Sequence, residues 1–96
     1  MKIALFQSEL VWENPAENWN LLEEKIRSIS EKIDLIVLPE MFTTGFSMRP
    51  DMVFDTMDGE TITWLQSLAK SKDSAITGSL VIKENDSFYN RLVFVF

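Results

Sequence analysis

The chain has 96 residues, and 15 aspartates and glutamates against 9 lysines and arginines give it a formal net charge of −6. This length is enough for one small domain, and the acidic charge argues against nucleic acid and anionic membranes as partners. The sequence contains no cysteine and no histidine, which excludes thiolate and imidazole metal sites and any mechanism whose nucleophile is a cysteine of this chain.

The first forty residues predict a strand, a helix and a second strand. Residues 2–7 contain a continuous apolar run, which is typical of a strand buried on both faces. Residues 14–32 are typical of an amphipathic helix with Asn14 as its N-cap, and the apolar face of this helix contains Trp19, Leu22, Ile26, Ile29 and Ile33. Residues 34–39 predict another buried strand, so we expect a right-handed β-α-β crossover between two parallel strands.

The remaining residues predict an irregular segment, a helix and a hairpin. Residues 40–57 show little periodicity and indicate a long loop, whereas residues 59–72 have the apolar spacing of a second helix. Residues 75–83 and 88–96 predict two antiparallel strands joined by the turn-like tetrad 84–87. The predicted fold class is therefore α/β, a single domain with the order β-α-β-α-β-β.

Glu40 is the residue whose position makes it a candidate for catalysis. It directly follows the predicted strand 34–39, and ligand crevices in open α/β sheets lie beyond the carboxyl ends of strands. A carboxylate at this place, beside the apolar Phe42 and Phe46, can act as a general base. The alternative is a solvated loop glutamate without a catalytic role.

Several segments of the chain together resemble the nitrilase superfamily, the carbon–nitrogen hydrolases. The first catalytic motif of that family resembles residues 38–46, which read LPEMFTTGF. Further segments are similar to strands and to a Tyr-Asn element of the family: residues 3–7, 34–38, 76–79 and 89–91. The resemblance covers essentially the whole chain in order, and the form of the first motif is most similar to the omega-amidase branch.

The resemblance implies both a fold and a chemistry. The fold is an α-β-β-α sandwich, of which residues 1–96 form the N-terminal portion of a single, incomplete domain. The implied activity is hydrolysis of carbon–nitrogen bonds other than peptide bonds, in an omega-amidase-like deamidation of a small dicarboxylic acid amide with release of ammonia. Members of the family use a Cys nucleophile, a Glu general base and a Lys that stabilises the oxyanion. Only the Glu has a counterpart here, so this chain alone is expected to be inactive.

The match to the family motif assigns roles to individual residues. Glu40 is the implied general base, and the residues after it are predicted to line the substrate pocket: Phe42, Thr44, Gly45 and Phe46. Core packing is the alternative for the two phenylalanines, and a turn that needs a positive φ is the alternative for Gly45. Asn90 is predicted to support the Glu40 loop by hydrogen bonds, with a simple turn or ladder contact as the alternative. No metal or cofactor is predicted.

Two other interpretations remain open at this point. The chain ends in residues 91–96, which are apolar after Arg91, and this is compatible with a non-catalytic protein that binds a partner or self-assembles through an exposed sheet edge. A flavodoxin-like binding domain is disfavoured because no glycine-rich phosphate loop follows either of the first two strands. Under the enzyme interpretation the expected partners are a small-molecule amide and a second copy in a homo-oligomeric dimer. The default expectation for location is cytoplasmic.

Overall fold

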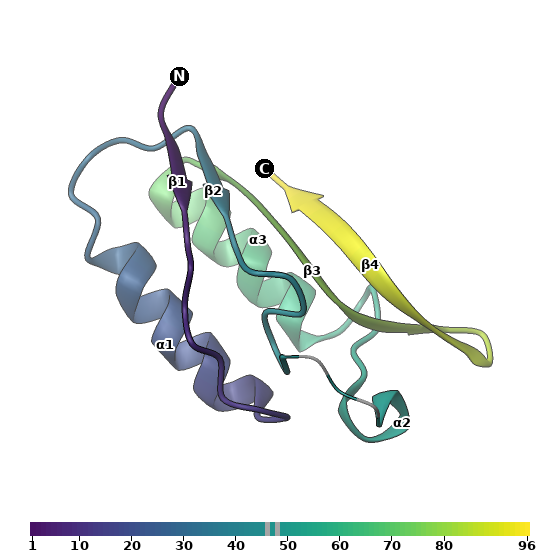
Figure 1. Ribbon diagram of the computed structural model, residues 1–96. Helices are drawn as coiled ribbons and strands as arrows, with labels where there is room; N and C mark the ends of the chain where they lie inside the picture. Colours follow the sequence, from purple (N-terminus) through teal and green to yellow (C-terminus); the bar gives the residue numbers. More distant parts are fainter. Residues whose placement is uncertain (46, 48) are drawn as a thin grey trace.

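The computed structural model describes residues 1–45, 47 and 49–96 (Figure 1). Helices α1 (Pro15–Arg27) and α3 (Glu60–Lys72) cover one face of a sheet, and α2 (Pro50–Val53) is a single helical turn in the connection between β2 and α3. The sheet contains β1 (Ile3–Leu5), β2 (Leu35–Val37), β3 (Ala75–Glu84) and β4 (Ser87–Val95).

The strands of the described residues form one four-stranded sheet in the order β1-β2-β3-β4. β2 pairs in parallel with both β1 and β3, whereas β3 and β4 form an antiparallel hairpin. Asn85 at the tip of this hairpin has φ 57°, a left-handed conformation that asparagine tolerates well. The predicted parallel β-α-β unit and the predicted hairpin are confirmed, and the antiparallel pairing contradicts the flavodoxin-like interpretation.

The hydrophobic core lies between the two long helices and the sheet. Helix α1 contributes Leu22 and Ile26, and both side chains are completely buried against β-strand residues such as Ile36. Helix α3 contributes Leu65 and Leu68 to the same cluster. Each such side chain stabilises the fold by about 1.5–3 kcal/mol relative to exposure, so the 3.6-residue spacing of the apolar positions is what attaches both helices to the sheet.

The first helix begins as predicted and ends earlier than predicted. The Asn14 side chain accepts a hydrogen bond of 3.2 Å from the backbone N–H of Glu17, which confirms the N-cap. The expected helix 14–32 is wrong at its C-terminal end, because α1 ends at Arg27. Ile33 is still buried in the core, although it lies outside the helix. The apolar period therefore continues past the last helical turn, and spacing alone did not show where the backbone leaves the helix.

The first strand is less buried than predicted. Ile3 and Leu5 are 54% and 75% exposed, whereas Ala4 between them packs against the core. β1 lies at an edge of the sheet, and both long helices cover only the face to which Ala4 belongs. The expectation of a strand buried on both faces was therefore wrong, because an apolar run does not say how many layers cover it.

The segment 40–57 is largely irregular, as predicted, with one exception. Residues Pro50–Val53 form the single helical turn α2, with Pro50 at its first helical position, where the missing N–H has no cost. The loop prediction missed this turn because four residues are too few to show a helical period. The expected site residue Phe46 lies outside the described residues.

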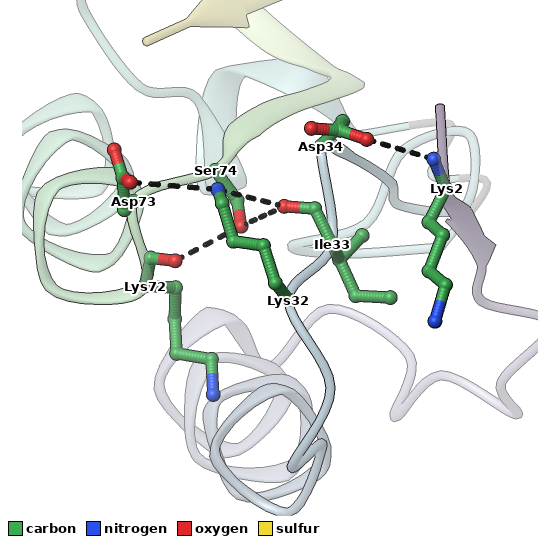
Figure 2. Close-up of polar contacts among 7 residues, drawn as sticks. All are labelled: Lys2, Lys32, Ile33, Asp34, Lys72, Asp73 and Ser74. Carbon is green, nitrogen blue, oxygen red and sulfur yellow. Dashed lines mark hydrogen bonds and ion pairs between the residues drawn. The ribbon is translucent and has the colours of Figure 1, made fainter.

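The amino end of β2 is tied to its neighbours by polar contacts (Figure 2). The backbone N–H of Lys2 donates to Asp34 Oδ2 at 2.8 Å, which joins the chain before β1 to the start of β2. The Ser74 hydroxyl donates to the carbonyl oxygen of Ile33, so the segment between α3 and β3 is held at the same end. Glu40 follows the opposite, carboxyl end of β2. The polar contacts that fix the amino end of this short strand are therefore separate from the residues around Glu40.

Candidate active site

Glu40 lies at the carboxyl end of β2, beside β3. The backbone N–H of Leu38 still donates to the carbonyl oxygen of Thr77 at 2.8 Å, so the chain stays attached to β3 just before Glu40. The Glu40 side chain is exposed and borders an open groove of about 400 Å³. The other residues that line this groove are Val37, Leu38, Thr77, Gly78, Ser79, Asn90 and Leu92. This is the position at which α/β sheets commonly bind ligands.

Asn90 reaches the Glu40 carboxylate from the hairpin. It lies on β4 opposite Val81 in the antiparallel register, and its Nδ2 donates to Glu40 Oε2 at 3.4 Å. Both side chains border the same groove. The structure therefore brings together the two residues that the sequence singled out as general base and supporting residue, although 50 positions separate them.

The turn after Glu40 has an unusual backbone conformation that β3 holds in place. Met41 has φ 52°, in the left-handed region that costs a residue with a side chain about 1–3 kcal/mol. Its backbone N–H donates to Ser79 Oγ at 2.9 Å, and the N–H of Phe42 donates to the carbonyl oxygen of Ser79 at 3.0 Å. Ser79 thus fixes the two residues that follow Glu40, and this role was not predicted from the sequence.

Phe42 lies in the core and does not line the groove. It is completely buried, and its ring centroid lies 6.3 Å from that of Trp64 on α3. Gly78 allows this approach, since a Cβ at Gly78 would lie 3.0 Å from Phe42 Cδ1 and 3.0 Å from Leu38 Cβ. The position of Phe42 agrees with the core-packing alternative that the sequence left open.

Thr44 and Gly45 belong to the turn and also lie apart from the groove. The Thr44 side chain is completely buried, and its hydroxyl donates to the carbonyl oxygen of Gly45 at 2.6 Å. Gly45 has φ 69°, which agrees with the alternative of a turn that needs a positive φ. Among the described residues, those that border the groove with Glu40 come from β2, β3, β4 and the chain just after β2.

Asn18 is a second residue that reasoning from the sequence missed. It is completely buried in α1, and its Nδ2 donates to the carbonyl oxygen of Thr43 at 2.7 Å. A signal existed, because helical spacing places Asn18 one turn before Leu22 and two turns before Ile26, on the buried face. An asparagine in such a row needs hydrogen-bond partners inside the protein.

Asp55 is a partly buried carboxylate on the connection between α2 and α3. Burial is the main cause that raises its pKa, and the nearby Glu60 charge acts in the same direction, while a hydrogen bond from the Thr61 hydroxyl opposes the rise. Its backbone N–H donates to the carbonyl oxygen of Val81 at 2.8 Å, and its carbonyl oxygen accepts from Lys83 N–H at 2.8 Å. Asp55 therefore attaches the chain after α2 to β3.

The part of the chain that the structure describes has neither a cluster of acidic side chains suited to a metal ion nor a helix suited to a membrane. No group of three or more Asp and Glu side chains in these residues is arranged to hold a metal ion. None of the helices in the same residues is both long and apolar enough to cross a membrane.

Comparison with known proteins identifies relatives along almost the whole of this chain. A family model described as carbon-nitrogen hydrolase matches residues 2–96. The chain is 36% identical over 97 residues to the omega-amidase YafV of Yersinia enterocolitica, covering 99% of this chain and 36% of that protein. It is 29% identical over 92 residues to the 2-oxoglutaramate amidase of Bacillus subtilis, covering 94% of this chain and 36% of that protein.

Solved structures show the same fold. A CN-hydrolase superfamily protein from Xanthomonas campestris superposes with a TM-score of 0.91 at 33% identity, over 97% of this chain and 35% of that chain. This chain thus spans 36% of the length of the two curated relatives named above. The predicted resemblance to the nitrilase superfamily, with its omega-amidase-type motif, is confirmed, and so is the α/β fold class.

Proposed function

Since the chain belongs to the carbon–nitrogen hydrolase family, we propose that its residues 1–96 provide the general base of an amidase, with Glu40 in that role. The observation that carries the proposal is the position of Glu40 in an open groove at the carboxyl end of β2, in contact with Asn90. The proposed reaction is omega-amidase-like hydrolysis of the terminal amide of a small dicarboxylic acid. The names of the Yersinia and Bacillus relatives support this substrate class.

The proposed chemistry is nucleophilic catalysis through a thioester. Glu40 accepts the proton of a cysteine thiol while the sulfur attacks the amide carbonyl carbon. The carbon–nitrogen bond then breaks, and the nitrogen takes this proton from Glu40 and departs as ammonia. Glu40 next takes a proton from water, whose oxygen attacks the thioester carbonyl carbon. The carbon–sulfur bond then breaks, the departing sulfur takes this proton from Glu40, and the acid is released with the cysteine thiol and the Glu40 carboxylate restored.

The nucleophile and the oxyanion lysine of this mechanism come from outside these 96 residues. The sequence contains no cysteine, so we propose that this stretch is the N-terminal portion of the hydrolase domain and is inactive by itself. Asn90 donates to Oε2 of Glu40, and we therefore assign proton transfer to Oε1. A hydrogen bond to one carboxylate oxygen restricts rotation of the whole carboxylate group. The second oxygen is thereby kept in one orientation, which favours proton transfer to it.

The test uses the full-length protein as its own gene encodes it. Its intact mass is measured first, and ammonia release is then assayed with short omega-amides for the unmodified protein, Glu40→Gln and Glu24→Gln. Glu24 is an exposed glutamate on α1 and serves as the matched control. We expect Glu40→Gln to lower turnover by about 10²–10⁴-fold, since glutamine cannot accept the thiol proton, and Glu24→Gln to leave it unchanged.

Two outcomes would contradict the proposal. One is near-normal turnover in Glu40→Gln at unchanged thermal stability. The other is an intact mass of 11.1 kDa together with no ammonia release, because the mass would show that no further residues supply the nucleophile.

A second candidate function is assembly through the sheet. Leu5, Leu92 and Phe94 are 75%, 72% and 55% exposed, and the last two lie on the edge strand β4. Exposed apolar strands at a sheet edge favour association with a second copy or another protein. Light scattering of the natural protein tests this function, with a dimer expected for the unmodified protein and a shift to monomer for Leu92→Lys.

A further inference from the structure

Asn18 forms a buried polar junction between three segments of the chain. Its Oδ1 accepts from the backbone N–H of Val11 at 2.7 Å, and its Nδ2 donates to the carbonyl oxygens of Val11 and Thr43, both at 2.7 Å. The side chain is completely buried and belongs to the first half of α1. One amide thus satisfies three backbone groups, and both of its N–H donors are used.

Glu13, in the segment before α1, forms further hydrogen bonds to the turn after Glu40 and to the residues just beyond it. The backbone N–H of Glu13 donates to the carbonyl oxygen of Thr44 at 2.7 Å. The Ser47 hydroxyl also donates to the Glu13 carboxylate. Glu13 itself has φ 53°, a left-handed conformation like that of Met41, which lies three residues before Thr44.

The turn that carries Glu40 is therefore held from two directions. Ser79 on β3 binds the N–H groups of Met41 and Phe42, and Asn18 on α1 binds the carbonyl oxygen of Thr43. A left-handed residue such as Met41 keeps its conformation only where its surroundings over-determine it. Ser79 binds the first two residues of the turn, Met41 and Phe42. The contact from α1 holds the next residue, Thr43, and so restrains the second half of the turn.

We propose that Asn18 is a positioning residue for Glu40, acting through the turn at residues 41–45. The inference rests on the proposed role of Glu40 as general base and adds a group that does not touch the substrate. Asn18 holds the Thr43 carbonyl, the turn holds the backbone of Glu40, and the Glu40 carboxylate thereby keeps its place beside Asn90. A displacement of about 1 Å at a catalytic group can lower the rate by roughly a hundredfold, which is the scale on which such a contact acts.

The test compares Asn18→Ala with Thr61→Val in the natural protein at its expressed length. Thr61 is also completely buried, and its hydroxyl donates to Asp55 Oδ1 at 2.7 Å, so Thr61→Val removes one hydrogen bond of a buried side chain away from the turn. Three readouts are taken: hydrogen exchange of the Phe42, Thr44 and Gly45 amides, the NMR signals of the Glu40 carboxyl carbon and Asn90 side-chain amide, and kcat separately from KM.

We expect both variants to lose thermal stability, Asn18→Ala more than Thr61→Val because it removes three hydrogen bonds instead of one, and only Asn18→Ala to change the turn. In Asn18→Ala the protection of the three amides falls by about tenfold or more, the scale of one lost buried hydrogen bond. The Glu40 and Asn90 signals shift, and kcat falls with little change in KM. Thr61→Val leaves the protection, both signals and kcat unchanged. If Asn18→Ala does not fold, Asn18→Ser gives the same comparison, since a hydroxyl is too short to bind both carbonyls.

The outcomes separate this inference from the proposed function. An Asn18 variant that loses stability but keeps the amide protection and the Glu40 signal would overturn the positioning role, whatever its activity. Loosening of the turn in a protein whose Glu40→Gln variant retains full turnover would instead overturn the proposed function, and the positioning role with it. The first two readouts need no substrate, so they decide the matter even where no amide is turned over.

Discussion

The Ser79 hydroxyl accepts a hydrogen bond of 2.9 Å from the backbone N–H of Met41, the residue that directly follows Glu40. The bond is buried and joins residues 38 positions apart, so it ties the end of β2 to the middle of β3. A single side chain thereby stabilises a left-handed backbone conformation next to the proposed general base.

Replacement of Ser79 by alanine should destabilise the fold and the turn together. The Met41 N–H would remain buried without its partner, which costs about 1–3 kcal/mol of unfolding free energy. Urea denaturation measures this loss, and Ser71→Ala is the control, because Ser71 is exposed and its hydroxyl contacts only its own helix at Leu68. Equal stability of the two variants would contradict the role given to Ser79.

Replacement of Gly78 by alanine should destabilise the protein by overpacking. The new Cβ would lie 3.0 Å from Leu38 Cβ and 3.0 Å from Phe42 Cδ1, and overpacked cores lose about 1–3 kcal/mol. The double variant Gly78→Ala with Phe42→Leu should recover part of this loss, since the smaller leucine makes room. Thermal unfolding of both single variants and the double variant measures the coupling, and strictly additive losses would contradict the proposed contact.

The partly buried Asp55 should make stability depend on pH in the acidic range. Its pKa is raised in the folded protein, mainly by burial, so the folded state binds a proton more tightly than the unfolded chain. The contribution of Asp55 to stability is therefore largest below the pKa of the unfolded chain, and it decreases as the pH rises to the folded pKa. Ionisation of Asp55 therefore costs the folded state more than it costs the unfolded chain.

The substitution Asp55→Asn tests this pH dependence. Asparagine keeps an oxygen acceptor for the Thr61 hydroxyl and cannot ionise. The stability of Asp55→Asn relative to the unmodified protein should therefore increase when the pH is raised from about 4 to about 7. Melting temperatures at both pH values measure the change, with Asp86→Asn at the exposed hairpin turn as the control. A difference between Asp55→Asn and the unmodified protein that is the same at both pH values would show that Asp55 does not titrate as proposed.

Local patterns in the sequence predicted most elements of the fold. The cap at Asn14, the apolar spacing of both long helices and the turn tetrad at residues 84–87 act over a few residues, and the structure confirms each of them. The early end of α1 was not predictable, because Ile33 continues the apolar period in a non-helical segment. The exposed face of β1 was not predictable either, since an apolar run does not report the number of layers around it.

The sequence by itself determined that Glu40 follows a strand in a carbon–nitrogen hydrolase motif, because strand periodicity and motif spacing are properties of neighbouring residues. Only the tertiary structure decided what surrounds this carboxylate. The contact with Asn90 depends on the register of β4 on β3, and the hydrogen bond from Asn18 to Thr43 depends on how α1 packs against the turn. Such contacts depend on how whole helices and strands pack on one another, and the spacing of residues along one segment does not determine this packing.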